Sequence, residues 1–198
     1  MKTVIQVILA IAIIVVGYFV YESIQEPLRF NAEKNQRYAA TIERLKDIRT
    51  AQVAYRSENK VYTSEFDSLI NFLKTGKFKV VKQIGDEDDS AAVSVGLVRD
   101  TILVSVLDSL FKKGYPVDSI RYVPYTDGVE FEMDTITLIA GKVKVNVFEA
   151  KVSNDVLLHG MDPQLTVNFN KEREKTVKYA GLKVGSLEET TNNAGNWE

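Results

Sequence analysis

The chain begins with a long apolar stretch that a single polar side chain interrupts. Between Val4 and Tyr21, only Gln6 carries a side chain that hydrocarbon would disfavour. As a helix rising about 1.5 Å per residue, this stretch is roughly 27 Å long, close to the ~30 Å hydrocarbon core of a bilayer. The pattern therefore predicts a transmembrane anchor over residues 1–24. The side chains expected to contact lipid are Val4, Ile5, Val7, Ile8, Leu9, Ile11, Ile13, Ile14, Val15, Val16 and Phe19.

A cleaved signal peptide is the alternative for this segment, because Lys2 followed by an apolar run also suits one. Signal peptidase needs small residues after the apolar run, whereas this run ends in the bulky side chains of Tyr18–Tyr21. Aromatic residues at that end suit the interface between lipid and water. We therefore expect the segment to stay in place as a single-pass anchor.

The positive charges around the anchor do not favour one orientation. Arg29 and Lys34 follow the span while Lys2 precedes it, so a count of cations opposes a cytoplasmic N-terminus. Large domains, however, cross membranes largely regardless of their charge. We expect a bacterial inner-membrane protein whose domain lies outside the cytoplasm.

After the anchor, apolar residues recur at spacings of three and four. Pro27 favours a kink or short break first, and Asn31 offers an N-cap for the helix that follows. This spacing predicts an amphipathic helix over residues 32–58, within a neck and helical segment 25–76. Its apolar stripe consists of Tyr38, Ile42, Leu45, Ile48, Ala51 and Tyr55. We expect the stripe to pack on a sheet of the same domain; a coiled-coil seam, the alternative, requires three or four clean heptads.

From Lys77 onward the hydrophobic period changes to two, which predicts an antiparallel sheet of about five or six strands over residues 77–185. The expected strands cover residues 77–84, 101–106, 120–126, 129–140 and 142–152, with weaker candidates at 154–158 and 165–169. Residues 98–111 also suit a helix. Asp127-Gly128 and Gly141-Lys142 are hairpin turn signals, and Thr63 or Ser64 is expected to cap a short second helix before the sheet.

Alternation within residues 142–152 places Val143, Val145 and Val147 on one face, which we expect to be buried. Residues 186–198 are expected to form a flexible tail on which Trp197 is the one large apolar side chain. The predicted fold class is therefore α+β: an N-terminal transmembrane helix, then an amphipathic helix packed on an antiparallel sheet.

Composition removes several classes of function. The net charge of −2 is far from the basic excess that nucleic-acid binding uses, so we expect no nucleic-acid partner. The sequence contains no cysteine, which excludes disulfides, thiolate nucleophiles and cysteine zinc sites.

Candidate chemistry is sparse. His159 is the only histidine and stands in a probable turn, and the acidic run 86–89 does not fit the spacing of an EF-hand calcium loop. Glu130, Glu132 and Asp134 alternate on one predicted strand, where a solvated sheet face explains them. We expect no catalytic residue, cofactor or metal ion.

The segment Asp47–Gly76 is similar to the region after the long helix in type IV pilins and type II secretion pseudopilins. The matching positions are Ile48, Ala51, Tyr55, Asn59, Tyr62, Thr63, Phe66 and Leu69. The likeness covers roughly the first 75 residues and implies an envelope assembly component. It does not extend to the prepilin processing motif or its nearby glutamate, since Lys2 follows Met1 and the first acid is Glu22.

Together these features predict a membrane-anchored, non-catalytic protein-interaction module whose partners are the membrane and other envelope proteins, in an oligomeric state that the pattern does not define. Two alternatives remain open: a membrane-tethered hydrolase that uses carboxylates, and a carrier of lipid or another small ligand. A cavity inside the sheet would favour the carrier, and a polar pocket joining acids of two strands would favour the hydrolase.

Overall fold

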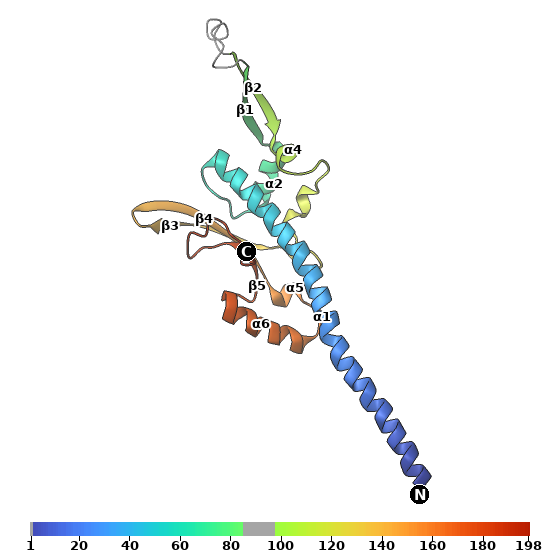
Figure 1. Ribbon diagram of the computed structural model, residues 1–198. Coiled ribbons are helices and arrows are strands. Elements are labelled where there is room, and N and C mark those ends of the chain that lie inside the picture. Colours follow the sequence, from blue (N-terminus) through green and yellow to red (C-terminus); the bar gives the residue numbers. More distant parts are fainter. Residues whose placement is uncertain (1, 85–97) are drawn as a thin grey trace.

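The computed structural model describes residues 2–84 and 98–198. It has the predicted α+β class, with one long apolar N-terminal helix and antiparallel sheets (Figure 1). In chain order the elements are α1 Lys2–Asn59, α2 Phe66–Thr75, β1 Lys77–Ile84, β2 Val98–Ser105, α4 Val106–Leu110, the 3-10 helix η1 Val117–Arg121, β3 Glu132–Ala140, β4 Val143–Ser153, α5 Asn154–Leu157, α6 Pro163–Val177 and β5 Gly181–Gly185.

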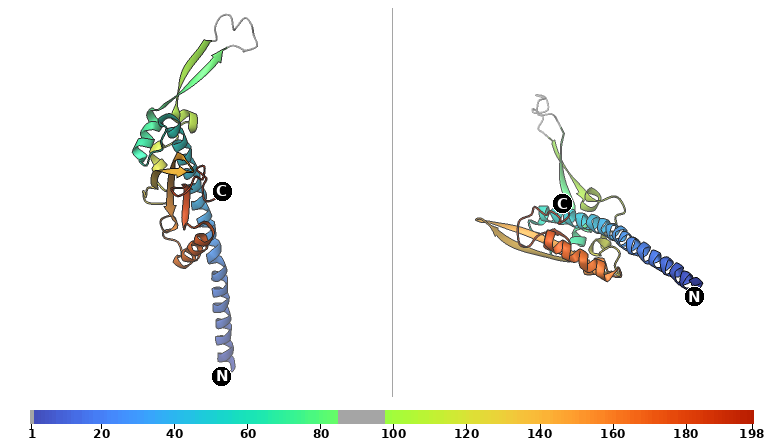
Figure 2. Two further views of the ribbon diagram at one scale, coloured as in Figure 1. Left: turned by 90° about the vertical axis from the view of Figure 1, so that its left-hand side faces the viewer. Right: turned by 60° about the horizontal axis from the view of Figure 1, so that its bottom comes forward.

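Helix α1 runs without interruption from the anchor into the domain, so the predicted break at Pro27 is wrong. Figures 1 and 2 show a single rod whose N-terminal half extends beyond all other elements. A proline inside a helix removes one amide donor, but the helical residues on both sides keep their own hydrogen bonds and continue the helix across it. Asn31 consequently caps nothing, and its Oδ1 accepts a hydrogen bond from Lys34 Nζ at 2.9 Å.

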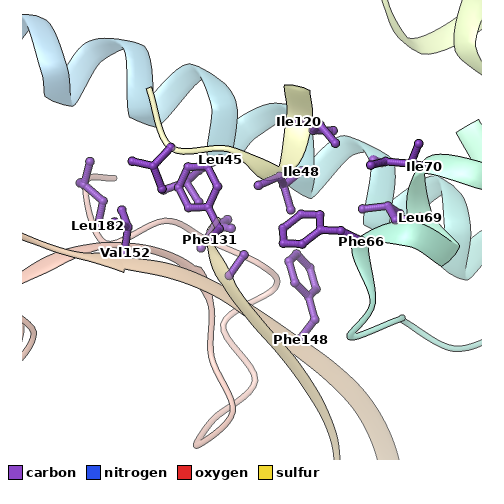
Figure 3. Packing of buried hydrophobic residues seen from close by; sticks show 14 of the residues in the cluster. Leu45, Ile48, Phe66, Leu69, Ile70, Ile120, Phe131, Phe148, Val152 and Leu182 are labelled. Carbon is purple, nitrogen blue, oxygen red and sulfur yellow. The ribbon is translucent and has the colours of Figure 1, made fainter. Parts of the chain in front are cut away.

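The hydrophobic core contains the middle of the α1 stripe. Leu45, Ile48 and Ala51 are fully buried, while Tyr38, Ile42 and Tyr55 are partly buried at its margins. The same cluster includes Phe66 and Leu69 of α2, Phe148 and Val152 of β4, and Leu182 of β5, which Figure 3 shows pointing toward one another. Burying a side chain of this size stabilises the fold by about 1.5–3 kcal/mol, so this cluster dominates the stability of the domain.

The strands form two sheets, not one sheet of five or six strands. β1 pairs with β2 in a two-stranded sheet, and the other sheet has the order β3-β4-β5, all antiparallel. The strands expected at 77–84 and 101–106 are confirmed within β1 and β2, and the turn at Gly141 joins β3 to β4. The acidic run 85–89 lies outside the described residues.

Two weak strand predictions in the C-terminal third are wrong. Residues 154–158 form the short helix α5, and residues 165–169 belong to α6. The side chain of Asp162 accepts a hydrogen bond from the Leu165 amide at 2.7 Å, and Pro163 occupies the first turn of α6. An aspartate cap followed by proline is a local helix-start signal, which the polar sequence of α6 made easy to overlook.

The strand expected at 120–126 is also wrong. Its first residues belong to η1, and only an isolated bridge links Tyr122 to Glu130. Pro124 has no amide proton to donate to a β-ladder hydrogen bond, and Tyr125 adopts a φ of 63°, so the chain turns there. Gly128 does take the expected positive φ, at 77°.

Strand β4 buries both faces in its inner half, including Val147 on the predicted face, and leaves the predicted face open toward its outer end. Phe148, Ala150 and Val152 lie in the core, whereas Val143 is exposed and Val145 is half-buried. Only the inner half of β4 lies against the domain, because the β3–β4 hairpin projects sideways (Figure 1). The valine face therefore leaves the body of the protein toward the hairpin tip.

The segment expected to be a flexible tail contacts the sheet and α1. Gly195 bridges Val184 of β5, the Asn196 amide donates to the Lys183 carbonyl at 3.0 Å, and Trp197 packs against the core. Glu198 forms an ion pair of 2.6 Å with Arg49. The tail thus covers the outer edge of β5, and its mobility stays a prediction.

Candidate functional site

The predicted anchor residues all lie on the exposed half of α1. No part of residues 2–84 and 98–198 covers them: Ile14 is 71% exposed and Phe19 is 65% exposed. Among the described residues, α1 is the one helix long and apolar enough to cross a membrane. Large apolar side chains at this density are disfavoured in water, so the exposed half requires an apolar environment from outside the chain.

Arg37 joins the domain to α1 about one turn beyond Glu33. Its Nη1 donates to the carbonyls of Leu157 and His159 at 2.9 and 3.0 Å, and its Nη2 pairs with Glu33 at 2.6 Å. These carbonyls lie at and just after the C-terminal end of α5, where carbonyl groups lack N–H donors within the helix. The mostly buried guanidinium therefore caps α5 and fixes it to α1.

Tyr38 extends this contact to α6. Its hydroxyl donates to Oδ1 of fully buried Asn154, whose Nδ2 donates to Asn170 Oδ1 at 2.8 Å. Its ring meets Phe169 edge-on at 5.7 Å between centroids, and Arg173 lies over the ring at 5.9 Å. Burial raises the pKa of Tyr38 to about 12, so the hydroxyl stays protonated as a donor at neutral pH.

Farther along α1, Gln52 holds the connection to α2. Its Nε2 donates to the Thr63 carbonyl at 2.6 Å, and its Oε1 accepts from the Thr63 amide at 3.2 Å. Helix α2 itself begins at Phe66, with Glu65 as an N-cap that makes no side-chain capping bond, so the expected Thr63 or Ser64 cap is wrong. The buried amide of Gln52 fixes the loop instead.

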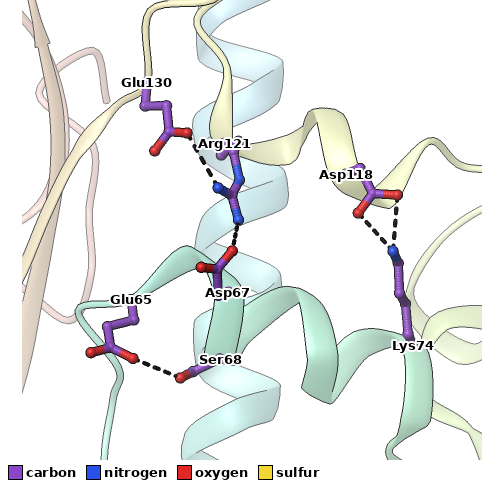
Figure 4. A network of polar contacts seen from close by, with 7 residues as sticks. All are labelled: Glu65, Asp67, Ser68, Lys74, Asp118, Arg121 and Glu130. Atoms are coloured by element: carbon purple, nitrogen blue, oxygen red, sulfur yellow. Dashed lines mark hydrogen bonds and ion pairs between the residues drawn. The ribbon is translucent and has the colours of Figure 1, made fainter.

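The distal part of the domain is joined by ion pairs on its surface (Figure 4). Arg121 contacts both Asp67 of α2 and Glu130, and Lys74 pairs with Asp118 at 2.6 Å. On α1, the Asp47 carboxylate accepts a hydrogen bond of 2.6 Å from the Tyr115 hydroxyl. Burial raises the pKa of Asp47 and that of Tyr115. These contacts attach α2, η1 and the following turn to one another and to α1.

A polar cleft of about 780 Å³ lies beside β4 and β5 and is lined by Glu149. Glu149 is 8% exposed, and its two carboxylate oxygens contact Lys151 at 3.4 Å and Lys183 at 3.0 Å. A buried carboxylate with a lysine on each oxygen is held in place, which suits a structural ion cluster. Strand alternation alone does not identify the lysine partners of Glu149, because Lys183 comes from a different strand.

The three acids considered for carboxylate chemistry do not meet. Glu130 pairs with Arg121 at 3.2 Å, and Glu132 lies 3.7 Å from Lys151. Asp134 is exposed and stands opposite Glu149 in the β3–β4 register. His159 is exposed in a turn. Within residues 2–84 and 98–198, no group of three or more His, Cys, Asp or Glu side chains is arranged to hold a metal ion.

The expected stripe and anchor thus lie on one helix, and the structure adds an open apolar hairpin and several polar contacts that no sequence pattern indicated. No protein-family model, no curated protein and no solved structure matches this chain.

Proposed function

We propose that this protein is a single-pass membrane-anchored, non-catalytic module that binds other envelope proteins, as a pilin-like component of a secretion or surface assembly. The continuity of α1 carries this proposal. One helix is exposed and apolar in its first half and buried in the domain core in its second half. An anchor of this kind holds the domain at a fixed height above the bilayer, without a flexible linker.

Several observations support the pilin-like part of the proposal. The long helix ends at Asn59, a short loop with Tyr62 follows, and α2 carries Phe66 and Leu69 into the core. This is the element order that the resemblance implies. In the proposal, the second half of α1 lies across the β3–β4–β5 sheet, whose core-facing residues share its hydrophobic cluster.

The polar side chains support a binding role over a catalytic one. Each buried ionic group described above has a partner in the chain: Arg37 binds carbonyls, and Glu149 binds two lysines. A general acid or nucleophile needs a free, positioned group facing a substrate. The polar contacts instead connect elements of the fold.

The anchor is tested by carbonate extraction of membranes that contain the full chain. We expect the wild-type chain to remain in the pellet, and Ile13→Arg/Ile14→Arg to be released, because each central arginine costs about 2.5–3.5 kcal/mol on insertion. Leu28→Arg, at an exposed apolar position beyond the predicted span, is the control and should stay in the pellet. Release of the wild-type chain would contradict anchoring.

The assembly role is tested by mild detergent extraction at low and high salt. A chain that acts in an assembly should elute with its partner at defined stoichiometry after crosslinking in the membrane. Recovery of the chain as an isolated monomer under both salt conditions would overturn this part of the proposal.

A further inference from the structure

The outer half of the β3–β4 hairpin carries an apolar face that no other part of the described chain covers completely. Residues directly opposite in an antiparallel pair share a face, and so do residues two apart on one strand. The hairpin's apolar face therefore consists of Ile136, Leu138, Ala140, Val143, Val145 and Val147. Ile136 is 48% exposed and Val143 is 63% exposed, while Val147 at the inner end is buried.

This face is organised for burial. All six members are apolar, whereas the opposite face is mixed: Thr137 Oγ1 donates to Asn146 Oδ1 at 2.7 Å, and Ile139, 73% exposed, stands opposite Lys144. A two-stranded hairpin is marginally stable in water unless its apolar side is covered. The alternation of valines predicts a buried strand face. On the projecting hairpin, that face becomes buried only if a partner covers it.

The charges at the two ends of this face indicate the partner. Asp134 lies four residues before Leu138, at the inner end, and Lys142 lies four residues after it, at the tip. Among the described residues, neither Asp134 nor Lys142 forms an ion pair within the chain. If two identical hairpins stack face to face and antiparallel about Leu138, each Lys142 reaches the other copy's Asp134.

We propose that the partner on this face is a second copy of the same chain. Two-fold interfaces bring the same patch together from both subunits, so they require a self-complementary surface. An apolar centre with an acid at the inner end and a lysine in the turn at the tip meets this requirement, because a two-fold rotation brings the inner end of one copy beside the tip of the other. The inference rests on the proposed function, for which it names the partner of one surface.

The position of the hairpin allows this contact between anchored chains. Figures 1 and 2 show the hairpin projecting to the side of α1 and away from its exposed N-terminal half. Two chains in one bilayer, side by side, can therefore bring their hairpins together outside the lipid. Confinement to the membrane raises the effective concentration of the second copy, so a small interface suffices.

Cysteine crosslinking of the purified full chain in lipid vesicles tests the proposal. Because the chain has no cysteine, each variant carries a single reactive thiol. Val145→Cys lies at the centre of the apolar face, opposite Leu138, and should give a covalent dimer with a short bismaleimide. Thr137→Cys, on the opposite face of the same hairpin, is the matched control and should give little dimer.

A charge exchange tests the pairing itself. In the Val145→Cys background, Lys142→Glu places like charges together in both halves of the interface and should lower the dimer yield about fivefold. Asp134→Lys alone should act the same way, and the double exchange should restore the yield. All these positions except Val145 are exposed, so the fold should tolerate the changes.

Equal crosslinking of Val145→Cys and Thr137→Cys would overturn the proposal, because random collision would explain it. Failure of the double exchange to restore the yield would also overturn the antiparallel pairing. If the chain stays in carbonate-washed membranes while Val145→Cys gives no dimer, self-association through this face is wrong and the anchored binding module still stands.

Discussion

The loop between α1 and α2 depends on one buried amide. Gln52 is fully buried, and its side-chain amide forms hydrogen bonds with both the backbone amide and the carbonyl of Thr63. Gln52→Met keeps a side chain of similar length but removes both hydrogen bonds. Thr63 is itself buried, so its two backbone groups lose their partner without gaining free access to water.

The size of the effect follows from these two groups. A buried donor or acceptor left without a partner costs about 1–3 kcal/mol. The expected loss in free energy of unfolding for Gln52→Met is therefore roughly 2–5 kcal/mol, a large share of the 5–15 kcal/mol typical of a domain.

Gln52→Glu separates the two hydrogen bonds. Its carboxylate still accepts from the Thr63 amide, but the second oxygen now faces the Thr63 carbonyl, and the charge is buried without a cation. Both effects raise the pKa of the introduced carboxyl in the folded protein above that in the unfolded chain. The folded state then binds the proton more tightly, so stability is low at pH values above the raised pKa and recovers as the pH falls through it toward the lower pKa of the unfolded chain.

Thermal unfolding of the detergent-solubilised full chain, followed by far-UV circular dichroism, measures both variants. Gln36→Met on the same helix is the control, because Gln36 is exposed and bonds only the Tyr125 hydroxyl, at 3.0 Å. It should change stability by less than about 0.5 kcal/mol. If Gln52→Met changes stability as little as this control, the role assigned to the buried amide is refuted.

Three further predictions use the same unfolding assay. Arg37→Ala should lower stability by about 2–3 kcal/mol, since it removes charged hydrogen bonds to two carbonyls at the end of α5, and Arg37→Lys should recover only part of this; equal stability of the two variants would contradict the capping role. Gly185→Ala should lower the free energy of unfolding by roughly 3 kcal/mol or more, because φ is 74° and a Cβ there would lie 2.1 Å from the Phe148 carbonyl oxygen. Gly141→Ala has a similar φ of 65° but open space around it, so it should lower the free energy of unfolding by only about 1–2 kcal/mol. Burial raises the pKa of Tyr38 to about 12 from 10.0, so the unfolded chain loses this proton first and stability should fall as the pH rises from 10 toward 12; Tyr38→Phe should make that fall less steep, and an unchanged slope would count against the burial.

Local signals were enough for the elements whose pattern is repeated many times. The apolar run of the anchor, the alternating residues of β1 and the glycine turn at Gly141 all appear where the sequence predicts them. Each depends on a preference that neighbouring residues express together, such as helical length, strand period or a positive φ. The helix-start signal at Asp162 and Pro163 was equally local, and giving it more weight would have identified α6.

Pairing and contact between distant segments decided the rest. β5 is only five residues long and becomes a strand because the inner half of β4 offers it a ladder on one side and the tail covers the other. Gln52 and Arg37 acquire their roles from backbone groups that other segments bring to them. The periodic patterns of a sequence do not reveal contacts between distant segments.

The sequence by itself determined that this protein has a long apolar N-terminal segment, a long amphipathic helix and strands with one apolar face, because these properties follow from the order of side chains along the chain. Only the tertiary structure decided that α1 continues through Pro27 and that the valine face of β4 leaves the body of the domain. The reason is physical: alternation defines two faces of a strand, but burial depends on which face meets the rest of the molecule.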